Sequence, residues 1–209
     1  YRAVLAEAIQ VGHGILKRGG SSQEAVEKTI NIMEDSPLFN AGKGAVLNSN
    51  ASIELDASFM EGKSLGAGAI SGVRTVKNPI SAAIKVMEAS PHVMLSGSGA
   101  DAFSNEQGLE IVSPEYFLTE RRINALKEVQ KASSMSKTNH KYQSNDFINQ
   151  QRYGTVGCVA LDIFGNLAAG TSTGGMTNKK WNRIGDAPII GAGTYAVSYT
   201  HLRAHETLL

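Results

Sequence analysis

Two threonine-bearing segments flanked by glycines could carry nucleophilic chemistry. GTVGCVALD covers residues 154–162, and GTSTGG follows at residues 170–175. A threonine hydroxyl is a weak nucleophile, and its own α-amine can act as general base only when that amine is free. A free α-amine titrates at about 7.7–8.0, so cleavage of the Gly154–Thr155 bond would supply such a base. Thr155 is therefore either the nucleophile of a self-cleaving hydrolase or a structural threonine at the start of a strand.

The second segment also matches the G-x-S-x-G pattern of serine hydrolases. Gly170, Ser172 and Gly174 occupy the fixed positions, and an aspartate and histidines follow in the order of a triad. That pattern needs a helix directly after the serine. GGMTNKKWNR is a poor helix start, so the sequence disfavours a serine hydrolase.

Other candidate sites are weaker still. SGSGAD at 96–101 lacks the Gly-Lys-Ser/Thr ending of a phosphate-binding loop and predicts a loop that opens a helix. His13, His92 and His140 are scattered and have no paired carboxylates at metal-ligand spacing. Cys158 is the single cysteine, which excludes an internal disulfide and predicts an inert core thiol.

Composition indicates a soluble globular protein. The 209 residues are 42% hydrophobic and 19% charged, and 20 Lys and Arg nearly balance 19 Asp and Glu. This balance predicts neither a nucleic acid nor an anionic membrane as partner, and no apolar run approaches the roughly 20 residues that span a bilayer. We expect a cytoplasmic protein, but the start in mid-helix, YRAVLAEAIQ, leaves a signal peptide open.

Helices and strands precede the threonine segments. A first helix is predicted before Gly19, with a buried face of Leu5, Ile9, Gly12 and Leu16. Ser21 and Glu24 form a capping-box pattern that starts a second helix. SIELDASF at 52–59 alternates apolar and polar residues, which predicts a strand with one buried face.

The middle of the chain continues this pattern. LGAGAISGV at 65–73 predicts a second strand, and Asn78 with Pro79 starts a helix that runs through Met87. Thr119 can cap a further helix. From 133 to 151, Ser, Asn, Lys and Gln dominate, which predicts a linker.

The threonine segments themselves predict a hairpin. Strands 155–162 and 167–172 flank a Gly165-Asn166 turn. Antiparallel pairing about that turn places the partner of Thr155 within a few residues of Thr173. Strands grouped together, with helices before them, favour stacked sheets covered by helices over a βαβ repeat.

With these segments in view, the sequence resembles the plant-type L-asparaginases, or isoaspartyl peptidases, of the N-terminal nucleophile hydrolases. The resemblance runs from about Leu5 to Ala196. The matching pieces are SPLFNAGKGAV (36–46), ELDASFM (54–60), GAGAISGV (66–73), NPISAA (78–83), SPHVML (90–95), GTVGCVALD (154–162), AAGTSTGGMTNK (168–179) and RIGDAPIIGAGTYA (183–196).

The resemblance implies an α+β fold, an αββα four-layer sandwich that is incomplete here at both ends. It also implies a precursor that cleaves itself before Thr155 and assembles as (αβ)2. Residues 1–154 then belong to the α subunit, with a linker at about 133–152, and residues 155–196 start the β subunit. Residues 197–209 depart from the family pattern, which continues to a Thr-Gly pair, and are expected to be a non-native tail in which His201 and His205 have no role.

The resemblance also assigns the site. Thr155 is the nucleophile, Thr173 supports it, and Arg183 and Asp186 hold the α-carboxylate and α-ammonium of the substrate. The implied substrates are L-asparagine and β-aspartyl (isoaspartyl) dipeptides. A glycosylasparaginase-like amidase, or an inactive fragment of the family, remains the alternative.

No cofactor is expected for catalysis, but the resemblance implies a structural sodium ion bound by backbone carbonyls. The loop is MEDSPLFNAGK at 33–43, and the matching carbonyl positions are Met33, Glu34, Ser36, Phe39, Ala41 and Lys43. Asn40 in this loop either positions the nucleophile or stabilises the loop. Potassium activation through the region 90–103 stays open.

Overall fold

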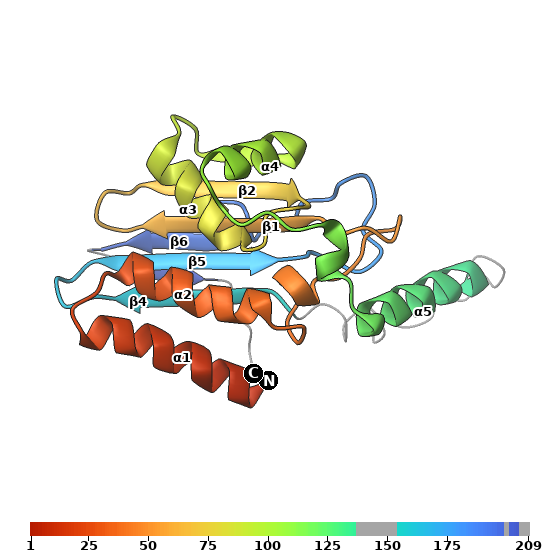
Figure 1. Ribbon diagram of the computed structural model, residues 1–209, viewed down its shortest axis with the longest axis horizontal. Helices are drawn as coiled ribbons and strands as arrows, with labels where there is room; N and C mark the ends of the chain where they lie inside the picture. The colour runs from red at the N-terminus through yellow and green to blue at the C-terminus, as the bar shows by residue number, and fades with distance from the viewer. Residues whose placement is uncertain (137–153, 199–200, 205–209) are drawn as a thin grey trace.

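The computed structural model describes residues 1–136, 154–198 and 201–204 (Figure 1). Most of the linker expected at 133–152, and part of the tail expected at 197–209, lie outside these residues. Only the start of the expected linker is described, and it is the last turn of a helix.

One five-stranded sheet organises the molecule, in the order β3-β2-β1-β5-β4. Neighbouring strands are antiparallel except for the parallel pair β2 and β3. A separate antiparallel pair is formed by β6 and β7. The strands are β1 (Leu55–Glu61), β2 (Ala67–Val73), β3 (Met94–Ser96), β4 (Val156–Leu161), β5 (Leu167–Thr173), β6 (Thr194–Val197) and β7 (His201–Ala204).

Helices α2 and α3 cover one face of this sheet, and α1 packs on α2 (Figure 1). Helix α5 projects away from the sheet beyond the end that holds the start of β1 (Figure 1). Within the described residues no helix has the length and apolar character that crossing a membrane requires. The helices are α1 (Arg2–Lys17), α2 (Ser22–Asp35), α3 (Pro79–Ala89), α4 (Gly97–Glu106) and α5 (Glu120–Ser136), with short 3-10 helices η1 (Gly42–Gly44) and η2 (Pro114–Phe117).

The predicted local signals are present in these elements. Ser21 Oγ accepts the backbone N–H of Glu24 at the start of α2, and Pro79 occupies the first turn of α3. Thr119 Oγ1 accepts the N–H of Arg122 at 3.4 Å, at the start of α5. The glycine-rich segment at 96–101 opens α4, as predicted.

The expected buried face of α1 is wrong at Ile9, which is 65% exposed. The buried residues of α1 are Ala8, Gly12 and Ile15. Thr29 of α2 lies so close that a Cβ at Gly12 would overlap its hydroxyl. The side of α1 that carries the small residues Ala8 and Gly12 therefore packs against α2, and Ile9 faces the solvent.

The prediction that β1 buries only one face is also wrong. Glu54, Asp56 and Ser58 are as buried as the apolar residues between them. The chain from 179 to 197 covers this second face: Ser58 Oγ lies 2.7 Å from Thr194 Oγ1. Apolar residues from both layers also form a small second core, made of Met60, Ala169, Ala196 and Val197.

The hairpin of β4 and β5 forms as predicted. Val156 pairs with Ser172, so Thr155 arrives beside Thr173 at one end of the sheet. On the other side of β5, Thr173 pairs with Asp56 of β1.

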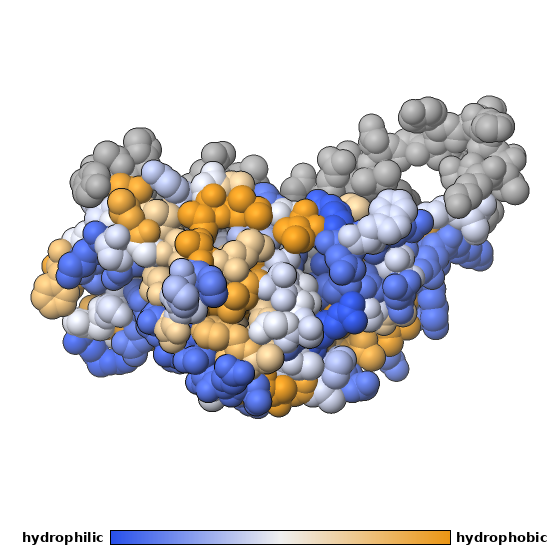
Figure 2. All heavy atoms as spheres, turned by 90° about the horizontal axis from the view of Figure 1, so that it is seen from above, coloured by the Kyte–Doolittle hydropathy of each residue, from blue (hydrophilic) through white to orange (hydrophobic). Residues whose placement is uncertain are grey.

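Seen from the side of α4, the surface shows a central patch of hydrophobic side chains bordered by hydrophilic ones (Figure 2).

Candidate active site

The two threonines meet at the end of the β4–β5 hairpin. Thr155 is half-buried and its Oγ1 donates to Thr173 Oγ1 at 3.0 Å. Thr173 is buried, and its Oγ1 also accepts the N–H of Gly175 at 3.0 Å. The second contact holds Thr173 Oγ1 in place, within hydrogen-bonding distance of Thr155 Oγ1. A hydroxyl held in this way can orient a neighbouring nucleophile.

The carbonyl before Thr155 is also held. The backbone N–H of Asn40 donates to Gly154 O at 3.0 Å. A Cβ at Gly154 would lie 2.5 Å from Cβ of Asn40, so only glycine fits without movement. Asn40 therefore contacts the carbonyl of the Gly154–Thr155 peptide bond, where the sequence predicts cleavage.

Other groups of Asn40 bind the second threonine segment, residues 170–175, so that Asn40 links this segment to Gly154. Its own carbonyl accepts the N–H of Gly174 at 3.1 Å, and its Nδ2 donates to Gly175 O at 2.7 Å. Its Oδ1 accepts the N–H of Val46 at 2.9 Å. Asn40 is 5% exposed, so the residue is a buried clamp between both segments.

A cavity of about 400 Å³ opens on the other side of Thr173. Asp56, which pairs with Thr173 on the neighbouring strand, is one of the residues that line the cavity. Arg183 lines the cavity too, with its guanidinium over Gly185. Asp186 lies three residues further on, at the surface.

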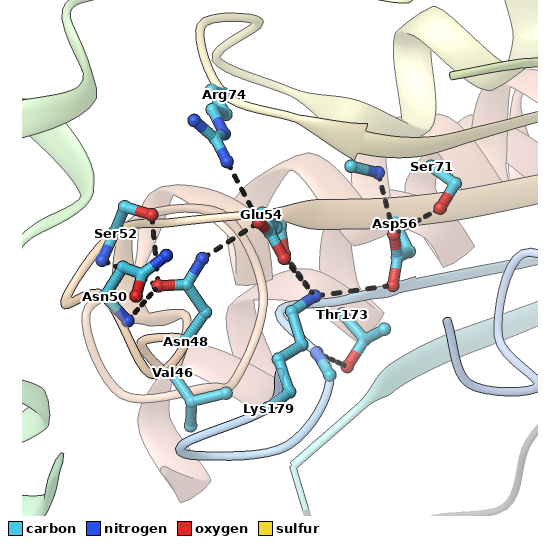
Figure 3. A network of polar contacts seen from close by, with 12 residues as sticks. Val46, Asn48, Asn50, Ser52, Glu54, Asp56, Ser71, Arg74, Thr173 and Lys179 are labelled. Carbon is cyan, nitrogen blue, oxygen red and sulfur yellow. Dashed lines mark hydrogen bonds and ion pairs between the residues drawn. The ribbon is translucent and has the colours of Figure 1, made fainter. Parts of the chain in front are cut away.

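Glu54, Asp56 and Lys179 line this cavity and form a buried cluster (Figure 3). Lys179 Nζ donates to the backbone O of Glu54 at 3.0 Å and lies 3.6 Å from its carboxylate. The carboxylate of Asp56 is 3.9 Å from the same Nζ. Arg74 Nη2 also contacts Glu54 Oε1, at 2.9 Å, from the rim.

The environment of Asp56 disfavours its charge. Burial raises the pKa of this carboxyl above its ordinary value, against the charge of Lys179 and the N–H of Gly72. Ser71 Oγ and Gly72 N–H both donate to Oδ1 at 2.9 Å. Within the described residues Oδ2 has no hydrogen-bond partner.

Sequence reasoning missed this cluster. Glu54 and Asp56 alternate with apolar residues and therefore looked solvent-facing, and Lys179 is one of two adjacent lysines. No local signal separates the buried Lys179 from the exposed Lys180. Only the covering of the second face of β1 distinguishes them.

The loop at 33–43 is tightly folded. Gly42 has φ of +48° and a Cβ there would overlap Glu34 O. A Cβ at Gly44 would likewise overlap Phe39 O. Met33 O and Ala41 O accept the N–H groups of Ser36 and Gly44, at 3.3 and 3.2 Å. The two glycines thus let the chain pack closely against the carbonyls of Glu34 and Phe39.

The side chain of Glu34 is fully buried beside this loop. Its Oε1 accepts the N–H of Ile80 at 3.0 Å and its Oε2 accepts from Asn78 Nδ2 at 3.2 Å. Glu34 therefore caps the start of α3 from α2. Burial raises the pKa of the Glu34 carboxyl from 4.5 to about 8.

The other candidates of the sequence stay outside the site. Ser172 is fully buried inside β5, and the described residues 174–193 contain turns where a serine hydrolase needs a helix. His13 and His92 are exposed, and His140 lies outside the described residues. Among the described residues no group of His, Cys, Asp and Glu side chains could hold a metal. Burial raises the pKa of the Cys158 thiol to about 11, in keeping with an inert thiol.

Comparison with known proteins decides the family, because the model of the asparaginase family matches residues 1–201. The chain belongs to the asparaginase family. It is 46% identical over 196 residues to an isoaspartyl peptidase of Escherichia coli (strain K12), covering 94% of this chain and 60% of that protein. It is 45% identical over 192 residues to an isoaspartyl peptidase/L-asparaginase of Homo sapiens, covering 92% and 59%.

A plant relative is similar as well. The chain is 41% identical over 213 residues to a probable isoaspartyl peptidase/L-asparaginase 2 of Arabidopsis thaliana, covering 95% of this chain and 66% of that protein. The chain thus spans about three fifths of the length of the bacterial and human relatives that it matches. These matches confirm the family resemblance found in the sequence.

Proposed function

We propose that the complete protein is an autoprocessing threonine amidohydrolase that hydrolyses the side-chain amide of L-asparagine and of β-aspartyl dipeptides. The observation that carries the proposal is the contact of Thr155 Oγ1 with Thr173 Oγ1 at 3.0 Å, directly after a carbonyl that Asn40 holds. The relatives named isoaspartyl peptidase and isoaspartyl peptidase/L-asparaginase support the same substrates.

Self-cleavage uses the groups around Gly154. Thr155 Oγ attacks the carbonyl carbon of Gly154, the C–N bond breaks, and the proton of the hydroxyl passes to the departing nitrogen. The ester so formed is hydrolysed by water, which leaves a carboxylate on Gly154 and a free α-amine on Thr155. The N–H of Asn40, 3.0 Å from Gly154 O, is a donor already in place for the charge that develops on that oxygen.

Turnover uses the new α-amine. The amine takes the proton from Thr155 Oγ, which attacks the side-chain carbonyl of the substrate and releases ammonia or an amino acid. Water then hydrolyses the acyl-enzyme to aspartate. Arg183, which lines the cavity next to Thr173, suits the α-carboxylate because its guanidinium is a two-pronged donor. Asp186 suits the α-ammonium.

The subunit organisation follows from the cleavage position. Residues 1–154 would form part of the α subunit and residues from 155 onward the start of the β subunit. The family resemblance implies that two such αβ units pair as (αβ)2. Helices on one face of the sheet and the β6–β7 pair behind the other support a four-layer αββα sandwich (Figure 1). The exposed hydrophobic patch in Figure 2 supports contacts with further protein surface.

We also propose a structural sodium ion at the loop 33–43, where the backbone carbonyls of Met33, Glu34, Ser36, Phe39, Ala41 and Lys43 would hold it. The ion would fix the loop that carries Asn40, and it takes no part in bond breaking. Gly42→Ala places a Cβ against Glu34 O at a φ of +48°, so it should lower the melting temperature and remove any stabilisation by added sodium. An unchanged sodium response in Gly42→Ala would contradict the site.

The function is tested with the full-length parent protein and three substrates. We expect hydrolysis of L-asparagine and of a β-aspartyl dipeptide, and none of the matching α-aspartyl dipeptide, because only the first two present free α-groups beside the side-chain carbonyl. Arg183→Ala should lose most of kcat/KM, whereas Arg18→Ala, at the exposed end of α1, should not. Near-normal efficiency of Arg183→Ala, or preference for the α-peptide, would refute the assignment.

A further inference from the structure

Lys179 is a buried cation with an unusual set of partners (Figure 3). Its side chain is 1% exposed, yet its Nζ has a backbone oxygen at 3.0 Å and two carboxylates at 3.6 and 3.9 Å. Burying a charged ammonium is unfavourable unless it is paired and hydrogen-bonded. Since well-packed apolar residues of similar size often stabilise a fold as well as a buried ion pair does, stability alone does not explain this arrangement.

The position of Lys179 in the chain suggests what the cluster does. Lys179 lies six residues after Thr173 and four residues before Arg183. On the sheet, its partner Asp56 pairs directly with Thr173. Lys179 therefore connects the segment between Thr173 and Arg183 to β1, the strand that pairs with Thr173.

Beyond Lys179 the connection is exposed and adopts unfavourable backbone angles. Trp181 and Asn182 both have φ of +53°, a left-handed conformation that is costly for residues other than glycine. Trp181 is 94% exposed, and Lys180, Asn182 and Arg183 are exposed as well. Backbone bonds hold the preceding residues, since Asn178 N–H donates to Leu47 O at 2.8 Å and Ser49 N–H donates to Lys179 O at 2.9 Å.

We propose that Lys179 is a positioning residue that holds the loop 180–186, and with it Arg183, at the cavity beside Thr173. The effect on turnover rests on the proposed function, whereas the effect on the loop does not. Without the contacts of Lys179 Nζ, the strained and exposed segment 180–186 becomes more mobile. Arg183 is then no longer held at the cavity. Because Arg183 and Asp186 would hold the α-groups of the bound substrate before the reaction as well, their displacement should raise KM more than it lowers kcat.

The charges of the cluster allow a sharp control. Glu54 keeps Arg74 at 2.9 Å when Lys179 is removed, but the buried Asp56 loses the ion pair at 3.9 Å. Lys179→Met should therefore destabilise the fold through an uncompensated carboxylate. In Lys179→Met/Asp56→Asn that carboxylate is gone too, so stability returns while the anchor to Glu54 O stays lost.

The experiment compares four full-length proteins: wild type, Lys179→Met, the double variant Lys179→Met/Asp56→Asn, and Lys180→Met. Lys180→Met is the matched control, because the neighbouring lysine is exposed. Each protein is measured for melting temperature, for KM and kcat with L-asparagine per free Thr155 N-terminus, and for the rate at which trypsin cuts the native protein after Arg183.

We expect Lys179→Met to melt earlier, to raise KM at least about tenfold, and to be cut faster after Arg183. The double variant should regain most of the melting temperature but keep the high KM and the fast cutting, and Lys180→Met should match wild type. The proposal is overturned if the double variant recovers all three properties, or if Lys179→Met behaves like Lys180→Met. If wild type hydrolyses no asparagine, the proposed function fails, and the trypsin rates still decide the role of Lys179.

Discussion

Replacing Asn40 with alanine tests whether the buried clamp holds the two threonine segments together. The substitution removes two side-chain hydrogen bonds, from Val46 N–H at 2.9 Å and to Gly175 O at 2.7 Å. Each buried group left without a partner costs about 1–3 kcal/mol. Val46 is buried and Gly175 only half-buried, so we expect a loss of roughly 2–4 kcal/mol in the free energy of unfolding. For a chain of this size that is a fall in melting temperature of roughly 4–16 °C.

Calorimetry in a Thr155→Ala background measures this loss free of self-cleavage, because every protein then stays a single chain. Asn40→Asp is the informative companion. It keeps an acceptor for Val46 N–H, but a carboxylate oxygen replaces the donor to Gly175 O and is repelled by that carbonyl. Asn40→Asp should therefore be less stable although it creates no cavity. In the cleavable background, Asn40→Ala should also cleave more slowly, since its backbone donor to Gly154 O is less firmly held. If Asn40→Ala melts within about 1 °C of the parent protein and is cleaved at the normal rate, Asn40 does not hold the two threonine segments together.

Two further predictions concern single hydrogen-bonding groups. Thr173→Val removes the acceptor of Thr155 Oγ1 and should lower kcat/KM roughly 10- to 100-fold, whereas Thr173→Ser keeps the hydroxyl and should retain most of it; equal losses in steady-state kinetics would argue against the role. For Glu34, the folded pKa of about 8 exceeds the ordinary 4.5, so the native state keeps a proton that the unfolded chain releases, and stability should fall as pH rises from about 4.5 to 8. Glu34→Gln should flatten that fall in melting curves, and an unchanged slope would contradict the buried, protonated carboxyl.

The sequence predicts the hairpin because its determinants are local. Two apolar runs and a Gly165-Asn166 turn determine which residues face each other, and the meeting of Thr155 with Thr173 follows from that pairing. Capping at Ser21 is local too, and the structure confirms it.

The second face of β1 could not be predicted in this way. Ser, Glu and Asp at alternate positions normally indicate a surface in contact with water. Here their partners come from far along the chain, as with Lys179, which is 125 residues from Glu54. The prediction of the buried face of α1 is wrong for a similar reason. The close approach of Thr29 to Gly12, which depends on a second helix, outweighs the burial of Ile9.

The central claim is that Thr155 becomes a free N-terminal nucleophile, and intact-mass analysis of the purified parent protein tests it most directly. We predict two chains, one that ends at Gly154 and one that begins at Thr155, and a single uncut, inactive chain for Thr155→Ala. Hydrolysis of L-asparagine by a protein that remains uncut at this bond would contradict the account.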